Sequence, residues 1–363
     1  MKVNLLEICT PKQWKTLATC ELLESGKYDV YGANGIIGKY DEYNHEFPTV
    51  LITCRGATCG NVHLSKPFSY INGNAMALDN LDETKCLNKY LYYYLKGIDL
   101  SNSISGSAQP QITIHGLKKI NIKLYDLNRQ NEIVTNLSKI DNLINLKNNQ
   151  IYKLEQLVKS QFVEMFGNMK NSIYNKKILS EVTLKITDGK HGGCESDPNS
   201  GYYFIGATEV FNNKIDYDNA KQITKKDFDI DYKRCDLKLD DFVIVNTGAT
   251  IGKSAIVSDE RCTKTLLQKS VALIRTDSSK ILPIYIKYLY DNEPSLYNQG
   301  QGCARVNLLL SQIKNTSVPV PPIELQNKFA QIVEQIDKQK FEFEMSLKKL
   351  EEMQAALMQE YFG

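Results

Sequence analysis

A segment of 40 residues occurs twice in this chain and restricts its fold more than any other feature. Residues 128–167 and 324–363 align without a gap, 196 positions apart, so that Gln130 matches Gln326. In the first copy, apolar residues recur at steps of three, four and seven, at Ile133, Leu137, Ile140, Ile144, Ile151, Leu154, Val158, Phe162 and Met165. That spacing predicts a long helix with one apolar stripe.

Both copies favour an uninterrupted helix. Neither contains Gly or Pro before its last residue, Gly167 or Gly363, and glycine suits the left-handed position just past a helix end. At 1.5 Å per residue, a helix of about 39 residues is roughly 58 Å long. Because an apolar stripe this narrow must be covered by another helix, we expect the two copies to pack together.

Composition adds broad limits. With 363 residues, 42% hydrophobic and 24% charged, the chain is expected to be a soluble protein with two domains and connectors. It has no run of 18 apolar residues and no N-terminal signal segment, so we expect no membrane association. Nine scattered cysteines without CxxC pairs favour reduced thiols in the cytoplasm. A net charge of +2 means that binding of nucleic acid must be argued locally.

A metal site is a weak alternative. Cys54, Cys59 and His63 could be imagined as ligands, but their spacing matches no standard zinc site. The second half of the chain has no histidine at the matching place. Ordinary core or loop cysteines are therefore favoured, and no metal or cofactor is expected in this chain.

The segments before the two helices share one plan, which predicts an α+β fold with two tandem mixed domains. The proposed division is a domain at 1–127, a helix at 128–167, a domain at 168–320 and a helix at 321–363. In the first domain we expect strands at 28–31, 49–53 and 120–122, a Tyr-rich helix at 87–96, and loops or turns at 10–15, 32–35, 55–60 and 105–112. The matching second-domain segments are 242–245 for a strand, 285–290 for the helix, and 247–252 and 302–308 for loops.

The separation between matched segments is informative. It is 174 between Leu5 and Leu179, reaches 196 by Ala108, and stays at 196 through Gly167. Insertions have thus entered the globular parts and not the helix. Surface loops accept length changes cheaply, whereas a helix that sets a distance between two bodies does not. The chain looks like two divergent recognition domains separated by two rods of equal length.

The segment Thr247–Ser254 resembles a phosphate-binding P-loop. A P-loop has four residues between its glycine and the Gly-Lys-Ser/Thr, and only three separate Gly248 from Gly252. The first copy, at 56–61, has no lysine. A plain glycine turn after a buried strand is one alternative. We favour a turn held close to a nucleic-acid backbone, with Arg55 in one copy and Lys253 in the other supplying charge.

Catalytic motifs are missing from the sequence. It has no Asn/Asp-Pro-Pro-Tyr/Phe methyltransferase motif, no Ser-His-Asp elbow, no HExxH and no convincing nuclease carboxylate cluster. Its four histidines, His45, His63, His115 and His191, are not repeated between the halves. We therefore expect a non-catalytic protein.

Two further loops carry donors suited to base edges or phosphates. The loop 187–193 places Lys190 and His191 among glycines, and is either a flexible turn or a DNA-contacting loop. Gln109 and Gln111 match Arg305 and Asn307 in the other half. Gln and Asn can pair with adenine and Arg with guanine, so these positions would fit two domains that read different sequences. They could equally be solvated loop side chains.

Taken together, these features resemble the specificity subunit of type I restriction-modification systems. The resemblance covers the full chain and is carried by two domains, each followed by a long helix, and by the motifs at 55–60, 247–252, 108–112, 188–192 and 318–326. The first half departs from it, because Tyr125-Asp126-Leu127 replaces the proline-rich lead-in to the helix.

The resemblance implies a function and partners. Each domain would be a target-recognition domain reading one half of a split, asymmetric site in double-stranded DNA, and the helices would pack as an antiparallel coiled coil that fixes the gap. Two methyltransferase subunits, which carry the S-adenosylmethionine chemistry, would dock beside the helices, with restriction/translocase subunits as further candidates. The candidate DNA-binding residues are Lys12, Gln13, Trp14, Asn34, Arg55, Thr58, Gln109, Gln111, Lys190, His191, Thr247, Thr250, Lys253, Arg305 and Asn307.

Two other functions compete with this interpretation. One is a nucleotide hydrolase that uses the loop 248–254, which the three-residue glycine spacing disfavours. The other is a helical scaffold without DNA specificity. Geometry agrees with DNA recognition, since half-sites one turn apart lie about 34–36 Å from centre to centre and a rod of the length above spans that distance.

Overall fold

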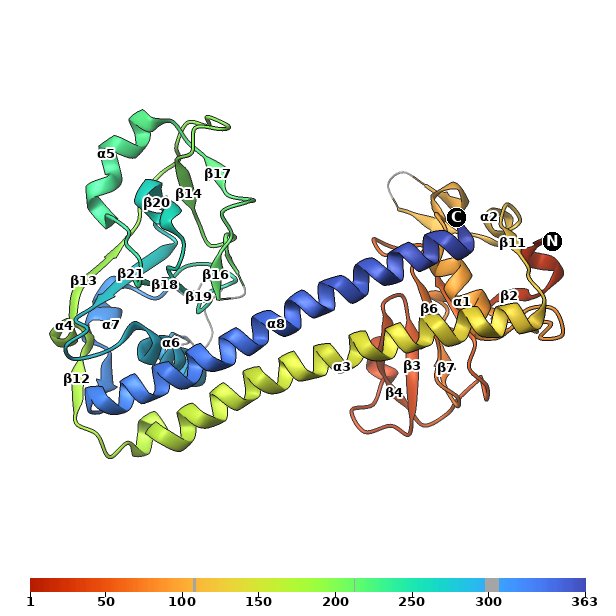
Figure 1. Cartoon of the computed structure of the whole chain (residues 1–363), viewed down its shortest axis with the longest axis horizontal. Helices are drawn as coiled ribbons and strands as arrows, with labels where there is room; N and C mark the ends of the chain where they lie inside the picture. Colours follow the sequence, from red (N-terminus) through yellow and green to blue (C-terminus); the bar gives the residue numbers. More distant parts are fainter. Residues whose placement is uncertain (107–108, 212, 298–306) are drawn as a thin grey trace. The chain divides into compact units, whose positions relative to one another are not determined.

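The computed structural model describes residues 1–106, 109–211, 213–297 and 307–363. The predictions that concern Ala108 and Arg305 lie outside these residues. The chain forms two compact units (Figure 1). Unit 1 comprises Met1–Gln150 and Phe343–Gly363, and unit 2 comprises Ile151–Glu342. Each long helix is therefore shared between the units.

The two long helices expected from the repeat are present. They are α3 (Leu127–Phe166) and α8 (Ile323–Phe362), each of 40 residues. Gly167 follows α3 with φ +70°, the left-handed conformation predicted for it. All nine residues of the predicted apolar stripe of α3 are buried or half-buried.

A buried glutamine fixes the start of each long helix in the same way. Gln130 Nε2 donates to the carbonyl of Lys85 at 2.7 Å, and its Oε1 accepts from the backbone N–H of Leu87 at 2.9 Å. In unit 2, Gln326 makes the equivalent bonds to Lys280 at 3.1 Å and Leu282 at 2.8 Å. The identity of these two glutamines in the repeat thus has a structural cause.

The first unit is built on a four-stranded antiparallel sheet of order β2-β8-β5-β6. Its strands are β2 (Thr10–Gln13), β8 (Ala75–Asp79), β5 (Val50–Thr53) and β6 (Val62–Leu64). The predicted strand at 49–53 is confirmed as β5, all of whose residues are buried. The prediction of a loop over 10–15 was wrong for Thr10–Gln13. As an edge strand, β2 tolerates Pro11 and exposes its polar residues, which read as a loop in the sequence.

A second sheet of unit 1 has the order β4-β3-β7. It consists of β4 (Gly35–Tyr40), β3 (Tyr28–Gly32) and β7 (Tyr70–Ile71), and confirms the predicted strand at 28–31 and the turn at 32–35. Two strand pairs complete the unit, β1 (Lys2–Asn4) with β11 (Asn121–Lys123) and β9 (Ile104–Ser105) with β10 (Gln111–Ile112). The loop predicted at 105–112 thus begins and ends in strands.

Unit 2 repeats three sheets of unit 1, namely the four-stranded sheet, the three-stranded sheet and the pair β1-β11. Its sheets have the orders β13-β21-β18-β19, β17-β14-β20 and β12-β22. The strands are β13 (Thr183–Asp188), β21 (Val271–Thr276), β18 (Phe242–Val245), β19 (Ser254–Ile256), β17 (Lys221–Gln222), β14 (Tyr203–Ile205), β20 (Thr265–Leu267), β12 (Lys176–Ile178) and β22 (Ser317–Pro319). Gln13 pairs with Met76 in unit 1 as Asp188 pairs with Ala272 in unit 2, so Gln13 and Asp188 are equivalent.

Each unit contains the Tyr-rich helix that the sequence predicted. These helices are α1 (Asn88–Gly97) and α6 (Pro283–Asn292). In unit 1, Tyr93 Oη donates to Asp141 of α3 at 2.6 Å. In unit 2, Tyr285 packs against Phe162 and Phe166 of α3, with ring centroids 5.5 and 4.9 Å apart. Short helices α2 (Ile114–Leu117), α4 (Leu179–Val182) and α7 (Leu310–Asn315) complete the units.

One α-helix has no counterpart in unit 1. Helix α5 (Lys225–Cys235) lies between β17 and β18, whereas the interval between β4 and β5, described throughout, contains no helix. The separation of equivalent residues grows from 175 at Gln13 and Asp188 to 192 at Val50 and Phe242. Helix α5, with the pair β15 (Val210–Phe211) and β16 (Lys214–Ile215), therefore lies in the inserted part that the sequence predicted.

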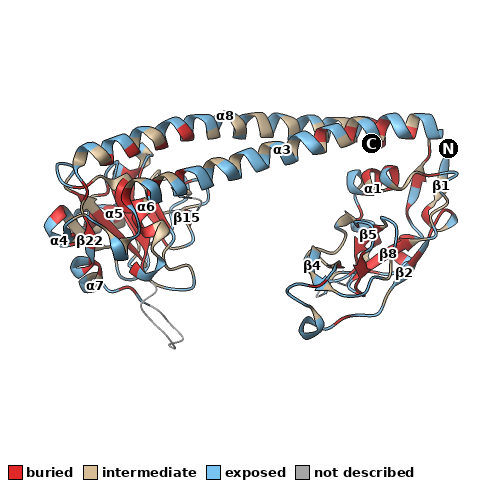
Figure 2. Ribbon diagram, turned by 90° about the horizontal axis from the view of Figure 1, so that it is seen from below, coloured by how far each residue is buried: buried red, intermediate tan, exposed pale blue. Residues whose placement is uncertain are grey.

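Buried residues gather in the sheets and at the ends of the long helices (Figure 2). The core of unit 1 takes Ile133 from α3 and Phe362 from α8, and the core of unit 2 takes Phe162 from α3 and Phe329 from α8. Between residues 141 and 157, α3 has no buried residue. The helices are thus held by their ends.

The long helices contact each other within each unit. In unit 1, Asn136 Nδ2 donates to Tyr361 Oη at 3.2 Å and Gln354 Nε2 donates to Asp141 Oδ1 at 2.6 Å. The partner number falls as the residue number rises, so these segments run in opposite directions. In unit 2, Lys340 forms an ion pair with Glu155.

Candidate functional site

A glycine loop of the same geometry follows the central buried strand in both units. In unit 1 the loop runs from Arg55 to Gly60 and Gly60 N donates to the carbonyl of Thr53 at 2.9 Å. In unit 2, Gly252 N donates to the carbonyl of Val245, also at 2.9 Å. The four glycines of these loops have φ between +90° and +101°, a region that favours glycine: Gly56, Gly60, Gly248 and Gly252.

A second loop meets the glycine loop in each unit. Arg55 forms a β-bridge with Gln111, and Thr247 forms the matching bridge with Asn307. Flanking backbone bonds repeat as well, from Ile112 N to the Cys54 carbonyl at 3.0 Å and from Leu308 N to the Asn246 carbonyl at 2.8 Å. The structure thus brings Gln111 to Arg55 and Asn307 to Thr247, positions that the sequence had matched only by their place in the repeat.

An open hollow of about 400 Å³ marks this junction in unit 1. Its lining residues are Ala33, Arg55, Gly56, Asn74, Gln109, Pro110 and Gln111. The exposed guanidinium and three side-chain amides present both donors and acceptors, the groups that read base edges. Asn34, also exposed, follows Ala33 in the β3–β4 turn. Asn74 was missed in the sequence, where only its place before the buried strand β8 set it apart.

The three candidates at the end of β2, Lys12, Gln13 and Trp14, have different surroundings. Lys12 is exposed, with Nζ 3.6 Å from the centroid of the Trp14 ring. Trp14 Nε1 donates to Asp79 at 3.0 Å, and the other oxygen of Asp79 lies 2.9 Å from His45 Nε2. Gln13 instead uses its amide within unit 1, donating to Cys54 Sγ at 2.9 Å and to the Gly73 carbonyl at 3.2 Å. Lys12 therefore faces solvent, whereas the donor groups of Gln13 and Trp14 bond to residues of unit 1.

The threonines of the glycine loops close their turns. Thr58 and Thr250 accept, through their carbonyls, from the backbone N–H of Asn61 at 3.0 Å and of Lys253 at 3.2 Å. Lys253 is exposed, with Nζ 5.3 Å from the centroid of the Phe211 ring. The lysine present only in the second copy thus stands on the surface beside an exposed aromatic ring.

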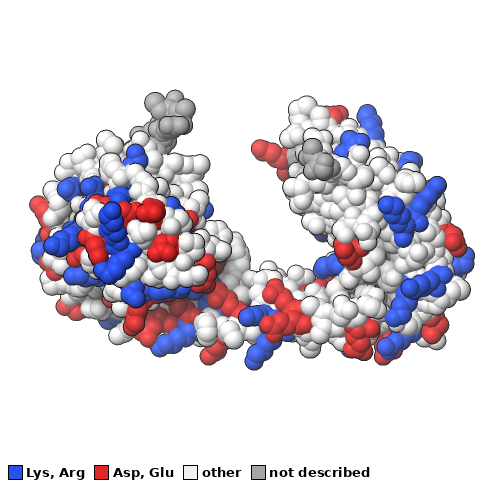
Figure 3. All heavy atoms as spheres, turned by 90° about the horizontal axis from the view of Figure 1, so that it is seen from above, with Lys and Arg blue, Asp and Glu red and all other residues white. Residues whose placement is uncertain are grey.

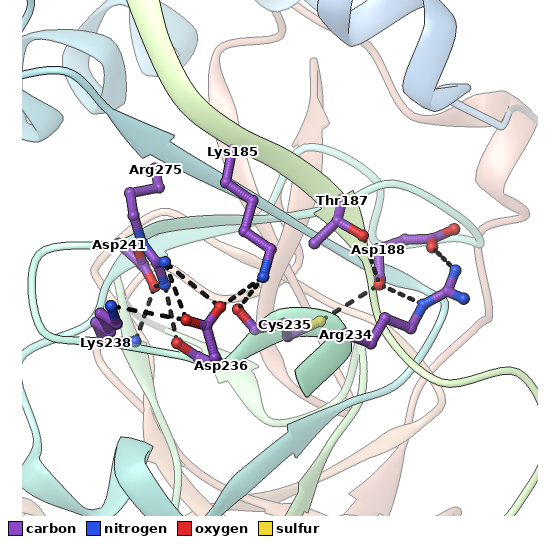
Figure 4. Close-up of polar contacts among 9 residues, drawn as sticks. All are labelled: Lys185, Thr187, Asp188, Arg234, Cys235, Asp236, Lys238, Asp241 and Arg275. Atoms are coloured by element: carbon purple, nitrogen blue, oxygen red, sulfur yellow. Dashed lines mark hydrogen bonds and ion pairs between the residues drawn. The ribbon is translucent and has the colours of Figure 1, made fainter. Parts of the chain in front are cut away.

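Ion pairs hold the strand that leads into the Lys190–His191 loop (Figure 4). Arg234 of α5 pairs with Asp188, and Lys185 Nζ lies 2.5 Å from Asp236. Lys190 Nζ lies 2.7 Å from Asp231 of α5, and this pairing raises the pKa of Lys190. The His191 side chain is 64% exposed. Within the candidate loop, the lysine is engaged and the histidine faces solvent.

Burial favours the neutral form of the cysteines near the site. Burial raises the pKa of Cys54, which is fully buried, and also raises that of Cys59. Within the ranges that the structure describes, no group of three His, Cys, Asp or Glu side chains is placed to hold a metal ion. The same ranges contain no helix long and apolar enough to cross a membrane.

Charge is spread rather than concentrated. On the face shown in Figure 3, Lys and Arg side chains are interspersed with Asp and Glu over each unit. This agrees with the net charge of +2.

The family model of the type I restriction modification DNA specificity domain matches residues 1–156 and 187–352. The chain belongs to this family. The resemblance inferred from the sequence is thereby confirmed. The family is one of DNA specificity domains, and its two matches correspond to the two tandem domains of the chain. The expectation of a non-catalytic recognition protein agrees with this membership.

Relatives and solved structures agree with the assignment. The chain is 31% identical over 127 residues to the type I restriction enzyme EcoprrI specificity subunit of Escherichia coli, a match that covers 34% of this chain and 30% of that relative. It is 23% identical over 315 residues to the putative type I restriction enzyme MjaX specificity subunit of Methanocaldococcus jannaschii, covering 80% and 72%. The fold matches the crystal structure of a type I restriction-modification system S subunit from M. genitalium with a TM-score of 0.59, 18% identity and coverage of 100% and 96%.

Proposed function

We propose that this chain is the sequence-specific DNA-recognition subunit of a cytoplasmic type I restriction-modification complex and carries no catalytic activity of its own. Each unit reads one half of a bipartite, asymmetric site in double-stranded DNA. The chain recruits two methyltransferase subunits, which supply S-adenosylmethionine chemistry, and restriction/translocase subunits are further partners of the assembled complex.

The duplicated loop junction carries this proposal. Arg55 with Gln111 and Thr247 with Asn307 occupy matching bridges in two units of equal topology, yet the side chains differ. Two units that recognise different DNA sequences would need the same backbone arrangement with different hydrogen-bonding side chains. A catalytic site would instead need the same reactive groups in the same places.

The long helices supply the spacing in this proposal. We propose that α3 and α8 form one antiparallel coiled coil between the two half-sites. The opposed contacts between their segments in unit 1 support this, as do the equal lengths of the helices. A helix of 40 residues spans roughly 60 Å at 1.5 Å per residue.

Exposed apolar side chains on the same helices support docking of the methyltransferase subunits. In unit 1 they are Leu143, Leu146, Met345 and Met353, and in unit 2 they are Tyr152, Leu157, Val163 and Phe341. Leu146 is 59% exposed and Tyr152 is 60% exposed. Large apolar side chains left in water along a helix mark protein-binding surfaces when they form a contiguous patch.

Selection of DNA from a random library tests the function. The chain is purified with its methyltransferase subunits, and bound DNA is sequenced. We expect one enriched motif made of two specific half-sites separated by a fixed unspecific gap. Binding without preference among sequences would contradict the proposal. A scaffold without DNA specificity predicts instead that the motif persists when both globular domains are replaced by unrelated readers.

A further inference from the structure

One face of the inserted helix α5 contacts the Lys190–His191 loop. Asp227, Asp231 and Arg234 are spaced by four and three residues, so they share one side of the helix. Asp231 pairs with Lys190 at 2.7 Å and Arg234 pairs with Asp188. These contacts fix the start of the loop.

The same helix face fixes the end of the loop. Asp227 Oδ2 accepts from the backbone N–H of Glu195 at 2.7 Å. The residues of α5 on the neighbouring side, Phe228 and Cys235, are buried. Helix α5 thus rests on unit 2 with its apolar side and holds both ends of the loop with its charged side.

The backbone of the loop is fixed between these contacts. Lys190 N donates to the Leu267 carbonyl at 2.7 Å, and the Lys190 carbonyl accepts from Lys269 N at 3.0 Å. A Cβ on Gly189 would lie 2.0 Å from the Leu267 carbonyl oxygen, so only glycine fits there. The loop is therefore held at Gly189 and Lys190 and again at Glu195.

Of the two candidate DNA contacts in this loop, His191 is the more exposed and the more loosely paired. The Lys190 side chain is 16% exposed and pairs with Asp231 at 2.7 Å, whereas that of His191 is 64% exposed and its Nε2 lies 3.8 Å from Asp188 Oδ2. Gly192, with φ +91°, and Gly193 follow it, and a Cβ at either would meet no atom within 4 Å. Open space on that side would allow a DNA surface to approach His191.

Unit 1 lacks this arrangement. The equivalence of Gln13 with Asp188 matches Lys15 to Lys190, and Lys15 is exposed. Among the residues that the structure describes, Lys15 forms no ion pair, and no helix occupies the place of α5. The pairing of Lys190 is therefore tied to the inserted helix and is not a general property of this strand end.

We propose that α5 is a brace for the loop 188–195, that Lys190 is a positioning residue and not a phosphate contact, and that His191 is the side chain with which this loop reads DNA. The proposal rests on the DNA-recognition function proposed above. It narrows the sequence-based expectation, which gave Lys190 and His191 the same role.

Salt dependence separates a positioning lysine from one that contacts phosphate. Removing one lysine–phosphate contact lowers the slope of log K against log salt by about 0.9. The chain in complex with its methyltransferase subunits is titrated with DNA carrying its selected site at several salt concentrations. For Lys190→Met we expect the wild-type slope, together with a roughly tenfold loss of preference for the unit 2 half-site over variants of it. A slope lowered by about 0.9, or an unchanged preference, would overturn the proposal.

Three further variants guard against unfolding as the cause. Asp231→Asn breaks the same ion pair without changing the loop, and we expect the same loss of preference at the unit 2 half-site. Lys190→Arg keeps the pair and should retain the wild-type preference. His191→Ala should lose preference at the same half-site with no change in slope. Full preference in Asp231→Asn or His191→Ala, or lost preference in Lys190→Arg, would count against the brace. Absence of any preference in the wild-type complex would refute the proposed function instead.

Discussion

At the scale of single residues, the sequence identified the types of group at the site but not their engagement. Arg55, Gln109 and Gln111 were predicted from two loops, and the structure places all three around one hollow. Lys190 and Gln13 were predicted in the same way, yet Lys190 forms an ion pair and Gln13 a hydrogen bond with residues of their own units. Their partners lie 41 residues away in sequence, at Asp231 and Cys54, and no local pattern indicates such pairs.

The loop junctions should control one half-site each. Arg55→Ala or Gln111→Ala should cost about 1–3 kcal/mol of discrimination at one half-site, because a bidentate base contact is lost. Asn307→Ala, at the matching junction of unit 2, should affect only the other half-site. Competition binding with single-base variants of the selected DNA measures both effects. Equal losses at both half-sites from one substitution would contradict a separate reader in each unit.

Acid should weaken the anchoring of α5. Burial alone raises the pKa of Asp236, but the hydrogen bond from Lys185 and the charge of Arg275 outweigh it, so the pKa lies below its ordinary value of 3.8. A lowered folded-state pKa means that the stabilisation is complete above that ordinary value and is lost as the pH falls through the folded pKa. Thermal unfolding between pH 5 and pH 3 should therefore show a smaller acid-induced loss for Asp236→Asn than for the wild type. Identical losses would show that this carboxylate does not contribute.

At the scale of elements, hydrophobic periodicity predicted a helix that buries one face. It did not predict an edge strand whose residues are mostly exposed. The stripe from Ile133 to Met165 predicted α3 because all of its members are buried or half-buried. Edge strand β2 was missed, since its exposed polar residues are those of a loop. Asp126 explains how α3 starts without a proline-rich lead-in, because its carboxylate accepts from the backbone N–H of Arg129 at 2.9 Å.

The buried glutamines should be required at both helix starts. Gln130→Ala removes the bonds to Lys85 and Leu87 and leaves buried backbone groups unpaired, which costs about 2–4 kcal/mol. Gln326→Ala should have a similar effect through Lys280 and Leu282. Chemical denaturation of each variant measures the change in the free energy of unfolding.

The control for this pair is a glutamine on the surface of α3. Gln150 is exposed, so Gln150→Ala should change the free energy of unfolding by no more than about 0.5 kcal/mol. A change as small as that of the control in either Gln130→Ala or Gln326→Ala would show that the buried bonds are not needed.

At the scale of the whole molecule, the duplication explains what varies and what does not. Unit 1 and unit 2 share their sheet topology, and the insertion that contains α5 lies within a globular part. Helices α3 and α8 have the same length, and each contributes to both units. The sequence predicted this through the constant separation of 196 positions across the repeat. It is the arrangement expected if helix length determines the gap between two half-sites.

Single-molecule sequencing of methylated DNA tests this central claim most directly. A host strain carries the methyltransferase subunits with either the wild-type chain or a variant with four residues inserted after the exposed Asn148 of α3, within a stretch that contains no buried residue. We predict that both strains methylate adenine in a bipartite motif with the same two half-sites, and that the insertion changes only the length of the gap. An unchanged gap, or a single uninterrupted motif, would contradict the account.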